Sequence, residues 1–174
     1  GQVATNCYFA INEETKEMVI VDPGDSAQML VEKIRQQGLE PKAVLLTHGH
    51  FDHAMAAEEM AENFGIKIYA HEAEKDTLEQ PRKNVAIMIG RKDVYHADVY
   101  VKDGEILNLA GMERKVLHTP GHTKGGCCYY FEREKVLFSG DTLFCQSVGR
   151  TDFPGGSMSE IVRSIKEKLM VLPD

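Results

Sequence analysis

Hydrophobic residues recur with two periods along the first half of the chain, and polar turns separate the segments that carry them. Apolar runs rich in Val and Ile predict strands over residues 5–11, 16–21, 42–47 and 66–70. A helical period predicts helices from residue 26 to about residue 37 and over residues 53–64. Asp25 or Ser26 can cap the first helix, and Gly38 can end it.

The second half of the chain is predominantly β in pattern. Residues 72–90 follow no single period, and we expect a helix and an ordered loop there. Strands are predicted over residues 98–101, 105–109, 115–119, 126–131 and 136–139, and a final amphipathic helix over 158–169. Strands bracket helices in both halves, which favours an α/β fold of layered sheets with helices outside. A length of 174 residues predicts one domain, covering residues 1–174.

Composition and charge limit the classes of protein to which the chain can belong. Apolar residues make up 43% of the chain, enough for a core, and no run approaches the roughly 20 residues that span a bilayer. The net charge of −7 disfavours nucleic-acid binding, which needs a basic surface. No signal peptide is visible. Four cysteines without a CxxC pair indicate reduced core thiols and a cytoplasmic protein: Cys7, Cys127, Cys128 and Cys145.

A cluster of metal-ligand residues follows the strand predicted over 42–47. His48 and His50 are two residues apart in an extended stretch, so their side chains can point to the same side. Asp52 and His53 come at the start of the next helix. Alone, Asp52 would be interpreted as a helix cap, and a single His as a surface or core residue. Together these residues predict a metal site, since zinc takes imidazole and carboxylate ligands from rigid elements.

Two further strand ends carry metal-capable side chains. His118 and His122 flank a Pro-Gly turn, and Asp141 follows Gly140 at the end of the strand over 136–139. Either segment alone is weak evidence, because turns at strand ends are common. Combined with the His48 segment, they extend the predicted metal site.

The stretches THGHFDH, HTPGHTKGG, FSGDTLF and GRTDFPGG occur in this order. With them the chain, from about residue 5 to its end, resembles the metallo-β-lactamase superfamily, specifically its short, glyoxalase-II-like (hydroxyacylglutathione hydrolase-like) members. The resemblance implies a four-layer αββα sandwich. It also implies a small-molecule substrate, a thioester such as S-lactoylglutathione, hydrolysed by a metal-bound hydroxide.

The resemblance further implies the roles of individual residues. It assigns His48, His50 and His122 to a first metal, Asp52 and His53 to a second, and Asp141 to both. Asp52 would also orient the nucleophile, which makes it the candidate catalytic residue. One or two Zn²⁺ ions are expected, with Fe or Mn as alternatives. His118 is then structural, and Asp22 either supports a metal-binding His or caps a turn.

Arg150 stands where glyoxalase II enzymes carry a basic residue that binds glutathione, and it is our candidate for substrate binding. The alternative is a structural ion pair with Asp152. Glyoxalase II enzymes tend to have an aromatic residue at the Asp152 position, and they carry a C-terminal helical domain and one further His ligand after an LPD segment. This sequence ends at Leu172-Pro173-Asp174. We therefore expect the natural chain to extend beyond both ends of this sequence.

Other chemistries remain open at this point. A mononuclear iron persulfide dioxygenase shares the fold and a GRTDF-like stretch, and would use His48, His122 and Asp141. A non-hydrolytic redox module with a di-iron site usually has Glu where this chain has His50. A secreted β-lactamase would need a secretion signal and a Cys-bearing second site, and a nuclease a basic surface.

Overall fold

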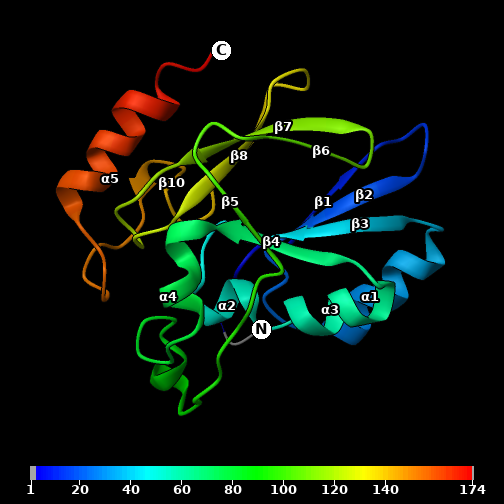
Figure 1. Cartoon of the computed structure of the whole chain (residues 1–174), viewed down its shortest axis with the longest axis horizontal. Coiled ribbons are helices and arrows are strands. Elements are labelled where there is room, and N and C mark those ends of the chain that lie inside the picture. Colours follow the sequence, from blue (N-terminus) through cyan, green and yellow to red (C-terminus); the bar gives the residue numbers. More distant parts are fainter. Residues whose placement is uncertain (1–2, 174) are drawn as a thin grey trace.

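The computed structural model describes residues 3–173, so Gly1 and Asp174, at which we predicted the sequence to be trimmed, lie outside the described residues. A first sheet of five strands occupies the N-terminal half (Figure 1). Its order follows the sequence: β1 (Tyr8–Ile11), β2 (Glu17–Val21), β3 (Glu40–Leu45), β4 (Lys67–His71) and β5 (Val99–Val101). β1 pairs antiparallel with β2, and the remaining pairs are parallel. The carboxyl ends of β2, β3, β4 and β5 therefore lie at one edge of this sheet.

The second sheet is an antiparallel meander of four strands. They are β6 (Ile106–Leu109), β7 (Met112–His118), β8 (Cys127–Phe131) and β9 (Val136–Phe138). A separate two-stranded hairpin follows, formed by β10 (Leu143–Phe144) and β11 (Ser147–Val148). The predicted strands over 98–101 to 136–139 are all present, shifted by a few residues at their ends.

The two sheets pack face to face, and helices cover both outer surfaces, as the αββα expectation requires. Val19, Val21 and Leu45 of the first sheet contact Val116 and Tyr129 of the second in one buried cluster. Full burial of such a side chain stabilises the fold by about 1.5–3 kcal/mol. The mixed α/β sandwich predicted from the sequence is therefore confirmed.

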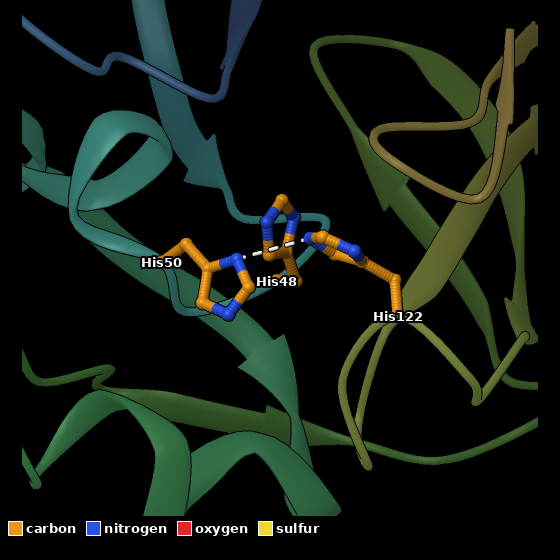
Figure 2. Close-up of side chains that lie close together, drawn as sticks. All are labelled: His48, His50 and His122. Carbon is orange, nitrogen blue, oxygen red and sulfur yellow. Dashed lines mark hydrogen bonds between the residues drawn. The ribbon is translucent and has the colours of Figure 1, made fainter. Parts of the chain in front are cut away.

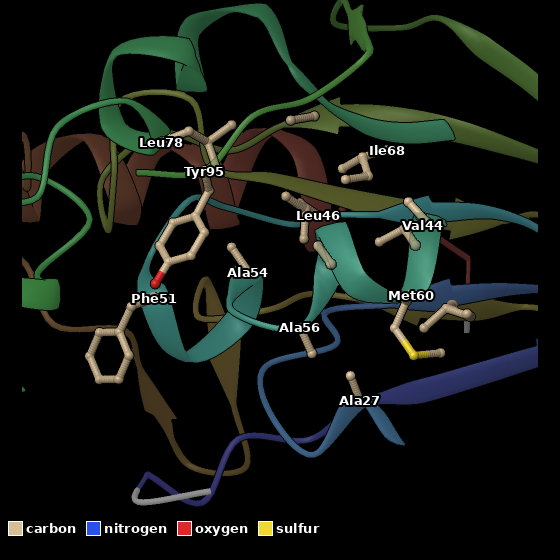
Figure 3. Packing of buried hydrophobic residues seen from close by; sticks show 14 of the residues in the cluster. Ala27, Val44, Leu46, Phe51, Ala54, Ala56, Met60, Ile68, Leu78 and Tyr95 are labelled. Carbon is tan, nitrogen blue, oxygen red and sulfur yellow. The ribbon is translucent and has the colours of Figure 1, made fainter. Parts of the chain in front are cut away.

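Helices α1 (Ala27–Gln36) and α3 (Ala57–Phe64) cover the outer face of the first sheet. Figure 3 shows Val44 and Ile68 of the sheet beside Met60 of α3 in this cluster. On the opposite side, α5 (Met158–Ser164) continues into a π-helical turn, η3 (Ile165–Leu169) (Figure 1). Leu169 of this turn packs on the second sheet. These two elements together make the predicted C-terminal helix. Ser157 caps it by accepting a hydrogen bond from the Glu160 amide.

The helix predicted over 53–64 is divided in two. A short helix α2 (Phe51–Ala54) ends before α3 begins, because the Ala56 amide donates to the Pro23 carbonyl, 2.9 Å away, outside the helix. Alanine-rich sequence favours one continuous helix, and this tertiary hydrogen bond overrides that preference. Ser26 occupies the predicted cap position of α1, but its side chain forms no capping hydrogen bond.

Residues 72–90 contain the predicted mixture of helix and loop: η1 (Glu72–Glu74), α4 (Lys75–Leu78) and η2 (Ala86–Ile89). None of the helices within residues 3–173 is long and apolar enough to cross a membrane. The four cysteines are free, but they are not all core thiols as we expected. Cys127 and Cys128 are buried, Cys7 is half-buried, and Cys145 is exposed in the turn between β10 and β11.

Candidate metal centre

Polar residues gather where the parallel strands of the first sheet end. Asp22 follows β2 in a left-handed conformation (φ 51°), which aspartate tolerates better than most residues. Its two carboxylate oxygens accept hydrogen bonds from the Thr47 amide at 2.7 Å and the Thr47 hydroxyl at 2.6 Å. Asp22 thereby fixes the backbone that leads directly into His48.

Three buried histidines converge from two loops (Figure 2). His48 and His50 follow β3, and His122 comes from the loop between β7 and β8 of the second sheet. Nε2 of His122 lies 3.0 Å from Nδ1 of His50, and the ring centroids of the three histidines are 4.6–4.8 Å apart. One nitrogen from each ring can therefore face a single ion.

A second group joins His48, His53 and Asp141, and in each group the ligand atoms lie within 4.8 Å of one another. Asp141 lies between the two groups: its carboxylate is 3.4 Å from Nε2 of His53 and 3.5 Å from Nε2 of His122. Asp52 lies beside the second group, with an oxygen 3.6 Å from Nε2 of His53. The structure thus brings all six sequence-predicted ligand residues together, although Asp52 is outside both groups.

The nitrogen atoms fit the requirements of a metal ligand. Nε2 of His48 is buried and has no hydrogen-bond partner among the described residues. For His50 the nitrogen that faces Nε2 of His122 is Nδ1 (Figure 2). Burial, followed by the neighbouring histidines, holds the pKa of both residues well below the ordinary value. They are neutral at pH 7, which is the form of imidazole that binds a metal. Burial also lowers the pKa of His122, and Asp141 partly offsets that shift.

Hydrogen bonds at Nδ1 orient two of the histidine rings. Nδ1 of His53 lies 2.9 Å from the Asp22 carboxylate, and Nδ1 of His122 lies 2.7 Å from the Arg150 carbonyl. Burial lowers the pKa of His53, but Asp22 and Asp141 outweigh it and raise the pKa to about 10. An acceptor at Nδ1 leaves Nε2 directed into the site, as in many metal centres. Asp22 therefore supports the ring of the candidate ligand His53, which is one of the two roles predicted for it, and it also fixes the Thr47 loop.

Glycines allow the ligand segments to approach one another closely. A Cβ at Gly140 would lie 2.2 Å from the Thr47 hydroxyl, and one at Gly149 would lie 1.7 Å from the Asp141 carbonyl. Real side chains cannot occupy either space. The SGD and VGR stretches therefore need glycine to bring Asp141 beside the histidines.

The Arg150 guanidinium is exposed and forms a bidentate ion pair with Asp152, at 2.9 and 2.7 Å. It also lies over the Phe153 ring, 4.2 Å from the centroid. That ring packs edge-on against His50, with centroids 5.4 Å apart. Arg150 is thus next to the site, with its charge paired to Asp152.

His118 does not join the metal-ligand groups. Its ring stacks on His71, 4.0 Å between centroids, and its Nε2 lies 2.9 Å from the Lys124 carbonyl. These contacts agree with the structural role expected for it.

Two residues near the site were not singled out from the sequence. Thr5 donates to the Asp52 carboxylate at 2.6 Å. Glu74, just after β4, accepts hydrogen bonds from both histidine loops. A signal for Glu74 existed, since polar residues at the carboxyl ends of neighbouring parallel strands share one edge. Thr5 had no such signal, because it contacts a residue 47 positions away.

Comparison with known proteins identifies related sequences and folds. The sequence model of the metallo-beta-lactamase superfamily matches residues 1–173. The hydroxyacylglutathione hydrolase GloC of Haemophilus influenzae is 38% identical over 172 residues, which cover 97% of this chain and 81% of that protein.

Two solved structures share the fold over nearly the whole chain. The BLEG-1 B3 metallo-beta-lactamase has a TM-score of 0.94 and 40% identity, covering 100% of this chain and 84% of that one. TTHA1623, solved in a di-iron-bound form, has a TM-score of 0.86 and 31% identity, covering 99% and 85% respectively.

Proposed function

The chain belongs to the metallo-β-lactamase superfamily, and we propose that it is a metal-dependent hydrolase of a thioester such as S-lactoylglutathione. The observation that carries the proposal is the convergence of His48, His50 and His122 beside a second group that includes His53 and Asp141. Such paired sites activate water for attack on a carbonyl. The 38% identity to a hydroxyacylglutathione hydrolase supports the choice of thioester.

We assign the ligands of two metal sites. His48, His50 and His122 would hold the first ion, Asp52 and His53 would belong to the second, and Asp141 would be shared by both. The position of the Asp141 carboxylate, within 3.5 Å of both His53 and His122, supports its bridging role. Zn²⁺ is the ion we propose, because imidazole and carboxylate ligands suit it. Fe is the main alternative, given the di-iron form of TTHA1623.

When bound, the ions supply a hydroxide at neutral pH and positive charge for the oxyanion. The protein residues orient and bind. Asp52, held by the Thr5 hydroxyl, accepts a hydrogen bond from the attacking water and orients it. Arg150 releases Asp152 and binds a carboxylate of the small-molecule substrate in its place. Its planar guanidinium suits that bidentate contact.

The test is hydrolysis of S-lactoylglutathione by protein loaded with Zn²⁺. The reaction is monitored by the decrease in thioester absorbance. We expect turnover that is abolished by chelation, restored by added Zn²⁺, and lost in Asp141→Asn. Absence of turnover on a panel of glutathione and simple acyl thioesters, with two ions bound, would overturn the proposal.

Two other substrates belong in the same assay. A β-lactam amide is the second candidate, because BLEG-1 shares the fold at 40% identity. A glutathione persulfide, with oxygen consumption as the readout and iron as the metal, tests the dioxygenase alternative. Turnover confined to either substrate would replace the thioester assignment and leave the metal site unaffected.

A further inference from the structure

Glu74 is a buried carboxylic acid, only 1% exposed, at the end of η1. Its hydrogen-bond donors are backbone amides and hydroxyl groups rather than a Lys or Arg side chain. Burial raises the pKa of Glu74 to about 7, and hydrogen bonds from Gly49, Thr123 and Gly125 oppose that shift. Burying a carboxylate without a neighbouring cation costs free energy, and the hydrogen bonds to Glu74 must offset that cost.

The two oxygens of Glu74 serve different loops. Oε1 accepts from the amide of Gly49, the residue between His48 and His50, at 2.9 Å. Oε2 accepts from the Thr123 hydroxyl at 3.0 Å and the Gly125 amide at 2.7 Å, directly after His122. One carboxylate therefore links the loop of the first sheet to the loop of the second.

The surrounding sequence is adapted to this close approach. A Cβ at Gly125 would lie 2.2 Å from the Glu74 amide nitrogen and 2.5 Å from its carboxylate. A Cβ at Gly49 would lie 2.9 Å from the Leu78 side chain on the adjoining helix α4. Both loops thus carry glycine where they meet the segment that bears Glu74.

We propose that Glu74 is a positioning residue for the first metal site: it sets the separation of His48 and His50 from His122. The inference rests on the proposed function only in its assignment of these histidines as metal ligands. A longer or weaker link between the loops would separate the three nitrogens and reduce the affinity for the ion. Groups hydrogen-bonded directly to a metal ligand typically contribute 10- to 100-fold in metal affinity, and we take this range as the scale for Glu74, which acts through the neighbouring backbone.

Glu74→Gln tests the link with almost no change in volume. An amide keeps one acceptor oxygen, and its NH₂ group would face donors from the other loop, so one of the two connections is lost. Thr123→Val removes a single hydrogen bond and keeps the carboxylate. Glu72→Gln, at an exposed position two residues away, is the matched control.

Zn²⁺ affinity is measured by competition with a chelating dye, without substrate, and the Co²⁺-loaded protein is examined by visible absorption. We expect Glu74→Gln to lose about 10- to 100-fold in affinity at the first site and to change the Co²⁺ spectrum. Thr123→Val should show a smaller loss in the same direction, and Glu72→Gln should match the wild type. Circular dichroism of the metal-free variants establishes that they fold.

A folded Glu74→Gln with wild-type affinity and spectrum overturns the proposal. If that variant does not fold, Thr123→Val decides: unchanged affinity and spectrum overturn it. Because these readouts need no substrate, they are independent of the hydrolase assay. If the protein hydrolyses none of the thioesters but Glu74→Gln still lowers its Zn²⁺ affinity, the proposed substrate is wrong and the positioning role of Glu74 stands.

Discussion

The Asp22 carboxylate lies 2.9 Å from Nδ1 of His53 and also accepts both hydrogen bonds from Thr47. One side chain thus orients a proposed second-site ligand and the backbone that precedes the first-site ligands. We expect Asp22→Asn, which keeps one acceptor but loses the charge, to lower metal affinity about 10-fold or more. Metal content after dialysis against buffered Zn²⁺ measures this. Two ions retained at wild-type affinity would show that Asp22 is dispensable for the site.

Gly140→Ala should destabilise the protein more than Gly38→Ala. Both glycines have positive φ, so each alanine carries a backbone strain of about 1–2 kcal/mol. A Cβ at Gly140 also lies 2.2 Å from the Thr47 hydroxyl, whereas none of the described atoms comes within 4 Å of one at Gly38. Urea unfolding gives both free energies of unfolding. Equal losses would mean that Thr47 moves aside without cost.

The sequence predicts much of this arrangement, because periodicity locates the strands and the candidate ligands follow strand ends. His48, His122 and Asp141 are candidates because each comes after an apolar run, and Asp52 because it begins the next helix in the same segment. The break between α2 and α3 was not predicted, since it depends on the Pro23 carbonyl capturing the Ala56 amide. That contact joins residues 33 positions apart and leaves no local signal.

The β10–β11 hairpin was missed for a different reason. Its strands have two residues each, and Leu143 and Phe144 are exposed, so no alternation of buried and exposed positions marks them. The position of Glu74 after a strand end was a usable signal, but its partners are 25, 49 and 51 residues away and leave no local pattern. The contact with Gly49 joins neighbouring strand ends of the first sheet, and those with Thr123 and Gly125 come from the docking of the two sheets.

We expect Cys145 to react with thiol reagents in the native protein much faster than the other cysteines. It is exposed, whereas burial raises the pKa of Cys7 to about 12 and of Cys128 to about 11, and raises the pKa of Cys127 well above its ordinary value. The thiolate is the reactive form. A timed assay with a chromogenic disulfide should give one fast thiol per chain, absent in Cys145→Ser. Fast labelling that persists in that variant would contradict the prediction.

His71 should make stability depend on pH in mildly acidic solution. Burial, then His118, lowers the pKa of His71 to about 4, below the value of about 6.5 in an unfolded chain. The unfolded state therefore binds more protons between these values, so stability present above pH 6.5 is lost as the pH falls toward 4.

His71→Gln should remove part of this dependence, on the order of 2–3 kcal/mol across that interval. Denaturant titrations at pH 4.5 and 7 measure it, with the exposed His96→Gln as the comparison. The other buried histidines keep their contributions in both variants. An unchanged slope in His71→Gln would show that the stacked pair is protonated without cost.

Asp152 should compete with substrate for Arg150. The bidentate ion pair occupies the guanidinium edge that a substrate carboxylate needs. On a glutathione thioester we expect Arg150→Ala to raise KM and Asp152→Ala to lower it, with little change in kcat for either. A simple acyl thioester without carboxylates is the control substrate, and its KM should not respond. Equal KM values in both variants and the wild type would show that Arg150 does not bind the substrate.

The histidines that face one another across the two sheets have a consequence for how the chain reaches its native state. His50 and His122 are 72 residues apart in sequence, so their encounter carries the loop-closure entropy of a long-range contact. The complete set of candidate ligands exists only when both sheets have docked. An ion bound by this set selects native molecules over unfolded ones and raises their population by mass action. With an ion at the proposed site, metal supply would thereby set the folded fraction of this protein.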